Sequence, residues 1–164
     1  MSRIVATVLY IGYLRPAPGT WASFATLPAA LVLYWIGGPF LVLGALVLAI
    51  AAGQWAIRIE TARGGDKDPS EIVIDEVAGQ LMALLPVVFG AWWVGAEVTA
   101  LWPGWIAAFV LFRLFDIWKP GPVGKADRSG GTWGVMVDDL IAGAFAALGV
   151  VILAAIAHLP VILG

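Results

Sequence analysis

Five long apolar stretches, separated by short connections, make up most of this 164-residue chain. An α-helix needs about 20 predominantly apolar residues to cross the hydrocarbon core of a bilayer. The sequence therefore predicts an all-α fold, a multi-pass transmembrane helical bundle of about five membrane helices. The predicted spans are residues 20–36, 39–58, 71–90, 99–118 and 135–158.

The composition agrees with a membrane protein and narrows its chemistry. Apolar residues make up 62% of the chain, charged residues 12%, and the mean hydropathy is +0.96. Soluble domains are about 45–50% apolar and about 25% charged. The length suits a single domain over residues 1–164. Cysteine is absent, which excludes thiolate zinc sites and cysteine nucleophiles.

Several classes of function lack their motifs. The one histidine, His158, lies near the C-terminus, so no histidine-dependent phosphatase or zinc hydrolase site is expected. No phosphate-binding P-loop, dinucleotide fingerprint or nucleic-acid motif occurs. We therefore expect no nucleic-acid partner, and no protein partner is evident.

The N-terminal residues 1–14 precede the first predicted span and form a short apolar segment. A signal peptide is disfavoured because residues 15–19, Arg-Pro-Ala-Pro-Gly, are a poor cleavage region and the chain continues hydrophobic. We expect a short interfacial or re-entrant helix. The first two spans are separated by Gly37, Gly38 and Pro39, which predict a tight helical hairpin turn.

The basic residues predict how the helices cross the membrane. Every Lys and Arg lies in the N-terminal segment, in the connections 58–70 and 119–134, or at a helix end beside them. Cytoplasmic loops are enriched in Lys and Arg. These segments are therefore predicted to be cytoplasmic, with the N-terminus inside, the C-terminus outside and the functional site on the cytoplasmic side.

Five carboxylates lie at the predicted cytoplasmic ends of the last three spans. A charge at the centre of a membrane helix costs about 2.5–3.5 kcal/mol, and less near the interface. With one arginine nearby, the set carries −5 + 1 = −4, so it needs compensating cations. The five are Asp75 and Glu76 in the third span, Asp116 in the fourth, and Asp138 and Asp139 opening the fifth.

Hard divalent cations suit such a set. Mg²⁺ takes oxygen ligands, usually one or two carboxylates together with water and substrate phosphate oxygens. We therefore predict that these five acids are the catalytic residues and the ligands of Mg²⁺. Gly79 and Gly143, each four residues after an acid, would allow the helices to approach closely.

A simpler interpretation applies to single acids. The helix macrodipole favours acids at helix N-termini, so capping or an ion pair with Arg58 or Arg63 would explain any one of them. Asp116 is the exception because it lies at a helix C-terminus, where the dipole opposes it. It therefore requires a specific partner.

Basic residues cluster beside these acids in the fourth connection. Alone, they suit anchoring to anionic lipid. Beside a carboxylate–metal site they suit a phosphate clamp, which glycine turns at helix N-termini would complete with backbone N–H groups. The predicted substrate-binding residues are Thr20, Arg113, Lys119, Lys125 and Arg128.

Five sequence blocks resemble the phosphatidylglycerophosphatase A family, in the family's order and over nearly the whole chain. They are residues 18–23 (Pro-Gly-Thr-Trp-Ala-Ser), 74–79 (Ile-Asp-Glu-Val-Ala-Gly), 112–120, 127–128 and 131–143. The Arg-x-x-Asp-x-x-Lys-Pro block at 113–120 and the Asp-Asp pair at 138–139 are the most specific. Ala22 departs from the pattern, where the family is expected to have glycine.

The resemblance implies a small, multi-pass, Mg²⁺-dependent enzyme of the bacterial inner membrane. It implies a phospholipid substrate, phosphatidylglycerophosphate, from which the terminal phosphate is removed to give phosphatidylglycerol. The alternative is a small ion or proton transporter, because acids within a membrane also mark ion pathways. A transporter would need acids distributed across the membrane, whereas these lie at one face.

Overall fold

The computed structural model describes residues 1–62, 70–129 and 131–163, which form helices and their connections without a strand. The prediction of an all-α fold is confirmed. The helices follow one another as α1 (Ser2–Ala6), η1 (Ile11–Tyr13), α2 (Pro18–Ala62), α3 (Ile74–Val94), η2 (Val98–Leu101), α4 (Trp102–Trp118), α5 (Pro122–Ser129) and α6 (Gly131–Leu163), where η marks short 3₁₀ helices.

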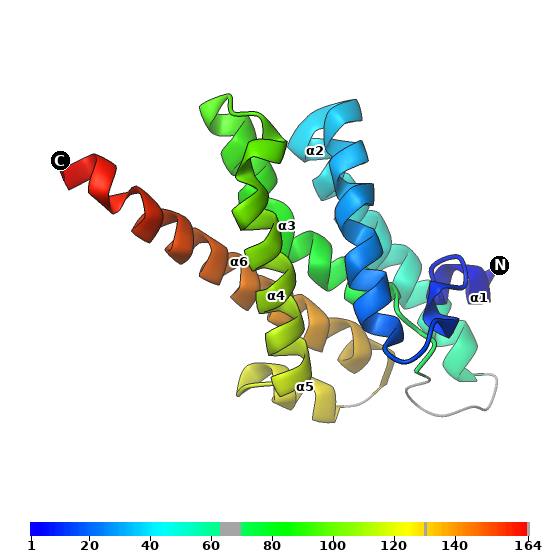
Figure 1. Ribbon diagram of the computed structural model, residues 1–164. Helices are drawn as coiled ribbons and strands as arrows, with labels where there is room; N and C mark the ends of the chain where they lie inside the picture. The colour runs from blue at the N-terminus through cyan, green and yellow to red at the C-terminus, as the bar shows by residue number, and fades with distance from the viewer. Residues whose placement is uncertain (63–69, 130, 164) are drawn as a thin grey trace.

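Four of these helical stretches are long and apolar enough to cross a membrane: Pro18–Ala62, Ile74–Val94, Val98–Trp118 and Trp133–His158. The first one folds back on itself. Gly37 (φ −148°, ψ 19°) and Gly38 (φ 66°, ψ −163°) interrupt α2, and Figure 1 shows its two arms running in opposite directions. The positive φ of Gly38 is readily adopted by glycine. The predicted hairpin is thereby confirmed. Its two arms and the other three stretches correspond to the five predicted apolar segments, and their crossing of the membrane stays a prediction.

Helix α3 is the centre of the bundle. It packs against α2, α4 and α6. Half of its most apolar stretch is buried inside the protein, compared with 17–22% in the other three candidate spans. Acids carried by α3 therefore lie within reach of several other helices.

Glycine allows α3 and α6 to cross closely. A Cβ atom at Gly79 would overlap the Phe112 ring and lie 2.7 Å from the backbone oxygen of Asp139. A Cβ atom at Gly143 would overlap the backbone oxygen of Gly79. The predicted role of these two glycines is confirmed, and the backbones touch where small residues line a helix interface.

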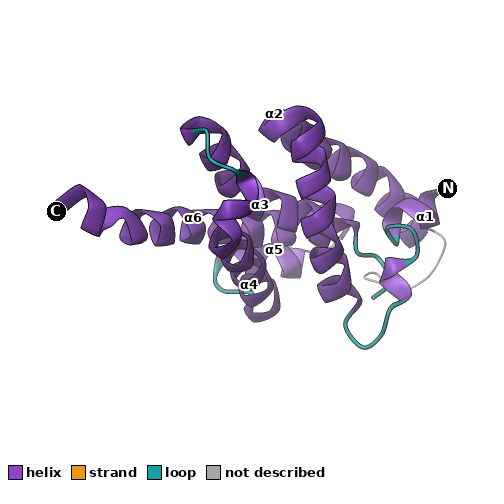
Figure 2. Ribbon diagram, turned by 45° about the horizontal axis from the view of Figure 1, so that its top comes forward, coloured by secondary structure: helices purple, strands orange, loops and turns teal. Residues whose placement is uncertain are grey.

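The two ends of the bundle differ (Figures 1 and 2). The turn between the arms of α2 and the connection between α3 and α4 lie at one end, and the short helix α5 lies at the other. In both views the C-terminal part of α6 projects away from the other helices. The side chains from Val151 to His158 are accordingly exposed.

The N-terminal segment folds against the end of the bundle that carries Glu60. The Ser2 hydroxyl donates to Glu60 Oε1 at 2.6 Å, and the Val73 backbone N–H donates to the Ala6 oxygen at 2.9 Å. The expected short helix is present as α1, and its place relative to the membrane interface stays a prediction.

The fourth connection differs from the prediction. It contains α5, and α6 begins at Gly131 rather than near residue 135. Left-handed backbone conformations at Lys119 (φ 50°) and Gly121 (φ 45°) end α4 and turn the chain into α5. Gly131 (φ 74°) starts the next helix. As a result, Asp138 and Asp139 lie two turns inside α6 and do not open it.

Candidate metal and phosphate site

Three carboxylates from two helices converge at one end of the bundle. Asp75 and Glu76 lie in the first turn of α3, and Asp139 lies on α6. One oxygen from each carboxylate lies within 4.8 Å of the others. Asp75 and Asp139 are buried, and Glu76 is partly buried. We call these three residues the carboxylate cluster.

Several oxygens in and beside the cluster have no hydrogen-bond partner in the described structure. They are Asp75 Oδ1, Glu76 Oε2 and Asp138 Oδ1, all inaccessible to solvent. Burying a carboxylate without a compensating partner is costly. A donor set made only of carboxylate oxygens suits a hard divalent cation, so the residues present fit Mg²⁺.

The other two predicted acids border the cluster and each pairs with a base. Asp116 Oδ2 lies 2.6 Å from Arg113 Nη1, and Asp138 Oδ2 lies 2.9 Å from Lys119 Nζ. Arg113 is therefore the specific partner that Asp116 required at the C-terminal end of α4. Asp116 also lies beside Asp139, close enough for the two charges to act on each other.

Dipole capping does not explain the acids on α6. The favourable effect of a helix N-terminus falls off within the first turn. Asp138 and Asp139 lie beyond the first turn of α6, which contains no acid. Asp75 and Glu76 do lie in the first turn of α3, so capping remains available only for that pair.

Lys119 connects α4, α5 and α6. It ends α4 in a left-handed conformation and hydrogen bonds with both Asp127 and Asp138. Partial burial alone would lower the pKa of Lys119, but the hydrogen bonds with the two aspartates outweigh it and raise the pKa above its ordinary value. Lys119 is therefore a fixed positive charge beside the cluster at neutral pH.

Arg113 connects the cluster to the amino end of α2. Its Nη1 lies 3.5 Å from the Ser23 hydroxyl, which itself donates to the Gly19 oxygen at 2.8 Å. The Arg113 Nε is buried without a partner among the described residues, so one donor remains for a ligand. Ser23 was not among the predicted residues, although it lies one helical turn after Gly19 on the same face.

The amino end of α2 touches the cluster directly. A Cβ atom at Gly19 would overlap Glu76 Oε1, so the backbone of this glycine lies directly against the carboxylate. Thr20 follows at the same helix end and is partly buried. The amino end of a helix carries unpaired N–H groups and a partial positive charge, which suit a phosphate group.

Two predicted residues lie outside this arrangement. Lys125 and Arg128 are exposed on α5. The Arg128 side chain folds back over Gly124 on its own helix. A Cβ atom added at Gly124 would lie 3.2 Å from Arg128 Nη1. The structure shows no side-chain hydrogen bond or ion pair for Lys125 within the described residues. The structure thus places Arg113 and Lys119 against acids of the site and brings the helix end that carries Thr20 beside Glu76, whereas Lys125 and Arg128 point elsewhere.

Comparison with known proteins identifies the family. The family model described as Phosphatidylglycerophosphatase A matches residues 4–154, which include every acid and base of the site. The chain belongs to this family. The family is named for a phosphatase activity. The chain is therefore an enzyme that hydrolyses a phosphate monoester.

Curated relatives cover most of the chain. Phosphatidylglycerophosphatase A of Haemophilus influenzae is 32% identical over 139 residues, 84% of this chain and 78% of that protein. A putative phosphatidylinositol-3-phosphatase of Bacteroides thetaiotaomicron is 35% identical over 148 residues, 87% and 86% of the two chains. Phosphatidylglycerophosphatase A of Escherichia coli is 31% identical over 132 residues, which cover 79% of this chain and 70% of that protein. No solved structure matches the chain significantly.

Proposed function

We propose that this enzyme removes the terminal phosphate of phosphatidylglycerophosphate, giving phosphatidylglycerol and phosphate, at the cytoplasmic face of the bacterial inner membrane. The observation that carries the proposal is the carboxylate cluster bordered by Arg113 and Lys119. Two of the three curated relatives are named for this activity. The placement of the basic residues supports the cytoplasmic side.

The proposal includes dependence on Mg²⁺. Asp75, Glu76 and Asp139 would hold the ion, since their oxygens converge and two of these residues each have a buried oxygen without a hydrogen-bond partner. When bound, Mg²⁺ supplies charge stabilisation at a phosphate oxygen and lowers the pKa of a coordinated water.

The basic residues bind and stabilise the phosphoryl group. The charge on the phosphoryl oxygens is stabilised in the transition state by positioned cations. Arg113 offers a planar pair of N–H donors and is held in place by Asp116 and Ser23. Lys119 supplies a point charge, and the amino end of α2 at Gly19 and Thr20 supplies backbone donors.

A carboxylate of the site either takes the proton from an attacking water or attacks phosphorus itself. In the first route, the leaving glycerol oxygen is expelled as the new phosphorus–oxygen bond forms. In the second, the carboxylate oxygen bonds to phosphorus as the bond from phosphorus to the glycerol oxygen breaks, and water then hydrolyses the aspartyl-phosphate to free phosphate and the carboxylate. Asp116 and Asp139 are the candidates in both routes, because Asp116 contacts Arg113 and Asp139 lies beside Asp116.

A transporter fits the structure less well. The acids lie near one end of the bundle, and the middle parts of α2, α3, α4 and α6 carry no charged residue. An ion pathway is marked by ionisable groups at intermediate depths. The arrangement of the acids therefore suits an enzyme active site at one membrane face better than an ion pathway across the membrane.

A substrate panel tests the proposed headgroup. Purified protein in detergent micelles with Mg²⁺ is offered phosphatidylglycerophosphate, phosphatidylinositol 3-phosphate and glycerol 3-phosphate, and phosphate release is measured. The proposal expects the highest kcat/KM with phosphatidylglycerophosphate. A higher value with phosphatidylinositol 3-phosphate would assign the substrate suggested by the name of the Bacteroides relative. Hydrolysis of neither lipid would contradict the proposal.

A further inference from the structure

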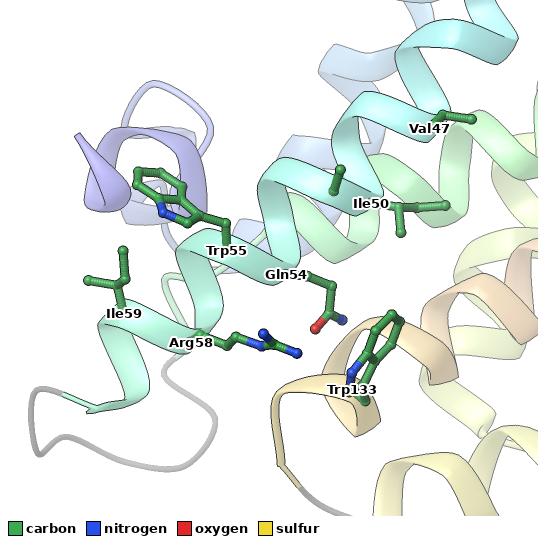
Figure 3. Close-up of a pocket in the computed structure, with 8 residues that line it drawn as sticks. Val47, Ile50, Gln54, Trp55, Arg58, Ile59 and Trp133 are labelled. Atoms are coloured by element: carbon green, nitrogen blue, oxygen red, sulfur yellow. The ribbon is translucent and has the colours of Figure 1, made fainter.

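A groove lies outside the carboxylate cluster, between the second arm of α2 and the start of α6 (Figure 3). Its volume is about 690 Å³. Its lining includes Val47, Ile50, Ala51, Gln54 and Arg58 from α2 and Trp133 from α6. None of these residues has a role in the proposed reaction.

The groove changes from apolar to polar along the helix. Residues 47, 50, 51, 54 and 58 recur at helical spacing and therefore follow one face of α2. Between Val47 and Arg58 the helix rises roughly 16 Å. Figure 3 shows the Gln54 and Arg58 side chains pointing toward Trp133, whereas Val47 and Ile50 lie farther along the groove. The polar end is the end at which α2 approaches the start of α6.

The groove faces away from the carboxylate cluster. Close contact of α2 with α3 and α6 closes its inner side, since a Cβ atom at Gly53 would lie 2.5 Å from Met136 Cε and 3.2 Å from Ile74. Trp133, Met136 and Asp139 are three residues apart on α6, and each step turns about 60° around the helix. Trp133 and Asp139 thus point roughly 120° apart, on either side of Met136.

The chemistry of the groove matches a phospholipid. The Arg58 side chain is exposed and makes no hydrogen bond or ion pair with another described residue. A guanidinium group binds phosphate through two parallel N–H donors. Tryptophan is enriched where membrane proteins meet lipid headgroups. The apolar part of the groove lies on a membrane-spanning arm, where its surroundings are acyl chains.

We propose that this groove binds one intact anionic phospholipid at a site separate from the catalytic cluster. The phosphate lies at Arg58 and Trp133, and one acyl chain lies along Val47, Ile50 and Ala51. Charge complementarity selects an anionic lipid over a zwitterionic one, because the positive charge of Arg58 has no carboxylate partner in the described structure. The inference does not depend on the substrate of the enzyme.

A fluorescent label in the groove tests the proposal. The chain has no cysteine, so Ala51→Cys provides a unique attachment point. The labelled protein is reconstituted in phosphatidylcholine vesicles with a small fraction of lipid carrying brominated acyl chains, which quench nearby fluorophores. The brominated lipid is either phosphatidylglycerol or phosphatidylcholine. We expect the groove label to report about fivefold stronger association with brominated phosphatidylglycerol than with brominated phosphatidylcholine. One arginine near a membrane surface contributes a difference of this size.

Three further samples make the test decisive. A label on Val151→Cys, on the exposed projecting part of α6, should be quenched equally by both lipids. Adding Arg58→Gln to the labelled Ala51→Cys protein should abolish the preference, while thermal unfolding shows that the protein remains folded. Adding Asp139→Asn instead should leave the preference intact, because the lipid is not bound at the cluster.

Three outcomes would overturn the proposal. Equal quenching of the groove label by the two lipids would show that the groove does not select anionic lipid. Loss of the preference in Asp139→Asn would assign the lipid to the catalytic site. Shielding of the groove label from both lipids would indicate that protein, such as a second copy of the chain, covers the groove.

Discussion

The backbone of Gly143 on α6 lies directly against the carbonyl oxygen of Gly79 on α3, with no room for a side chain between them. Each glycine follows an acid of the carboxylate cluster by four residues, Asp75 on α3 and Asp139 on α6. One helical turn separates positions four apart. The glycine contact therefore sets the distance at which the two carboxylates face each other.

Gly143→Ala should separate α3 from α6 and reduce both stability and activity. Inserting a methyl group into a tightly packed interface typically costs about 1–3 kcal/mol. Thermal unfolding and phosphate release are measured together. Gly90→Ala on α3 is the matched control, since a Cβ atom there meets nothing within 4 Å. If the two variants behaved alike, the close contact would not determine the site.

Lys119→Ala should lower turnover on the order of 10²-fold. Removing one group that stabilises charge in a transition state typically lowers kcat by about this factor. Thermal stability should also fall, because the buried Asp138 loses its cation. Lys119→Arg keeps the positive charge and should recover stability. Stopped assays of phosphate release, with thermal unfolding of each variant, check both effects. Full turnover in Lys119→Ala would remove this residue from the site.

Asp116→Asn should also lower turnover on the order of 10²-fold while leaving the protein folded. The amide keeps the size of the carboxylate and can still accept a hydrogen bond from Arg113, so thermal stability should change little. Glu97→Gln, at an exposed position between α3 and α4, is the control for loss of a carboxylate and should retain activity. A parallel loss of folding in Asp116→Asn would indicate a structural role instead.

Single cysteines should report opposite sides of the membrane for the two ends of the bundle. We expect an impermeant thiol reagent to reach Glu97→Cys from outside intact spheroplasts and Lys125→Cys only after the membrane is opened. The reason is the positive-inside distribution of Lys and Arg. Labelling of both cysteines from one side would contradict the five-segment topology.

Much of the fold follows from patterns within single helices. The five apolar stretches predicted the long apolar helices, and Gly37 and Gly38 predicted the hairpin, because helix length and backbone freedom are local properties. The start of α6 was less predictable. Glycine and polar residues from 130 to 134 resemble a loop, yet the structure begins the helix at Gly131.

The sequence predicted that acids from different helices gather at one end of the bundle, but not how they are arranged there. Asp75, Glu76 and Asp139 were predicted as acids at one membrane face, and only the fold shows that they converge whereas Asp116 and Asp138 each pair with a base. Ser23 belongs to the resembling block 18–23, but its role in the site is seen only when Arg113 reaches it in the fold. Lys125 and Arg128 share the charge of Lys119 but lie on the exposed face of α5, a helix that was not predicted.

The central claim is that the carboxylate cluster hydrolyses phosphatidylglycerophosphate with the help of Mg²⁺. The most direct measurement is phosphate release from this lipid by the purified protein and by Asp139→Asn, each after treatment with EDTA and again after addition of Mg²⁺. The account predicts that EDTA abolishes turnover by the unmodified protein, that Mg²⁺ restores it, and that Asp139→Asn stays inactive in both conditions. Full turnover in EDTA, or an Asp139→Asn variant as active as the unmodified protein, would contradict it.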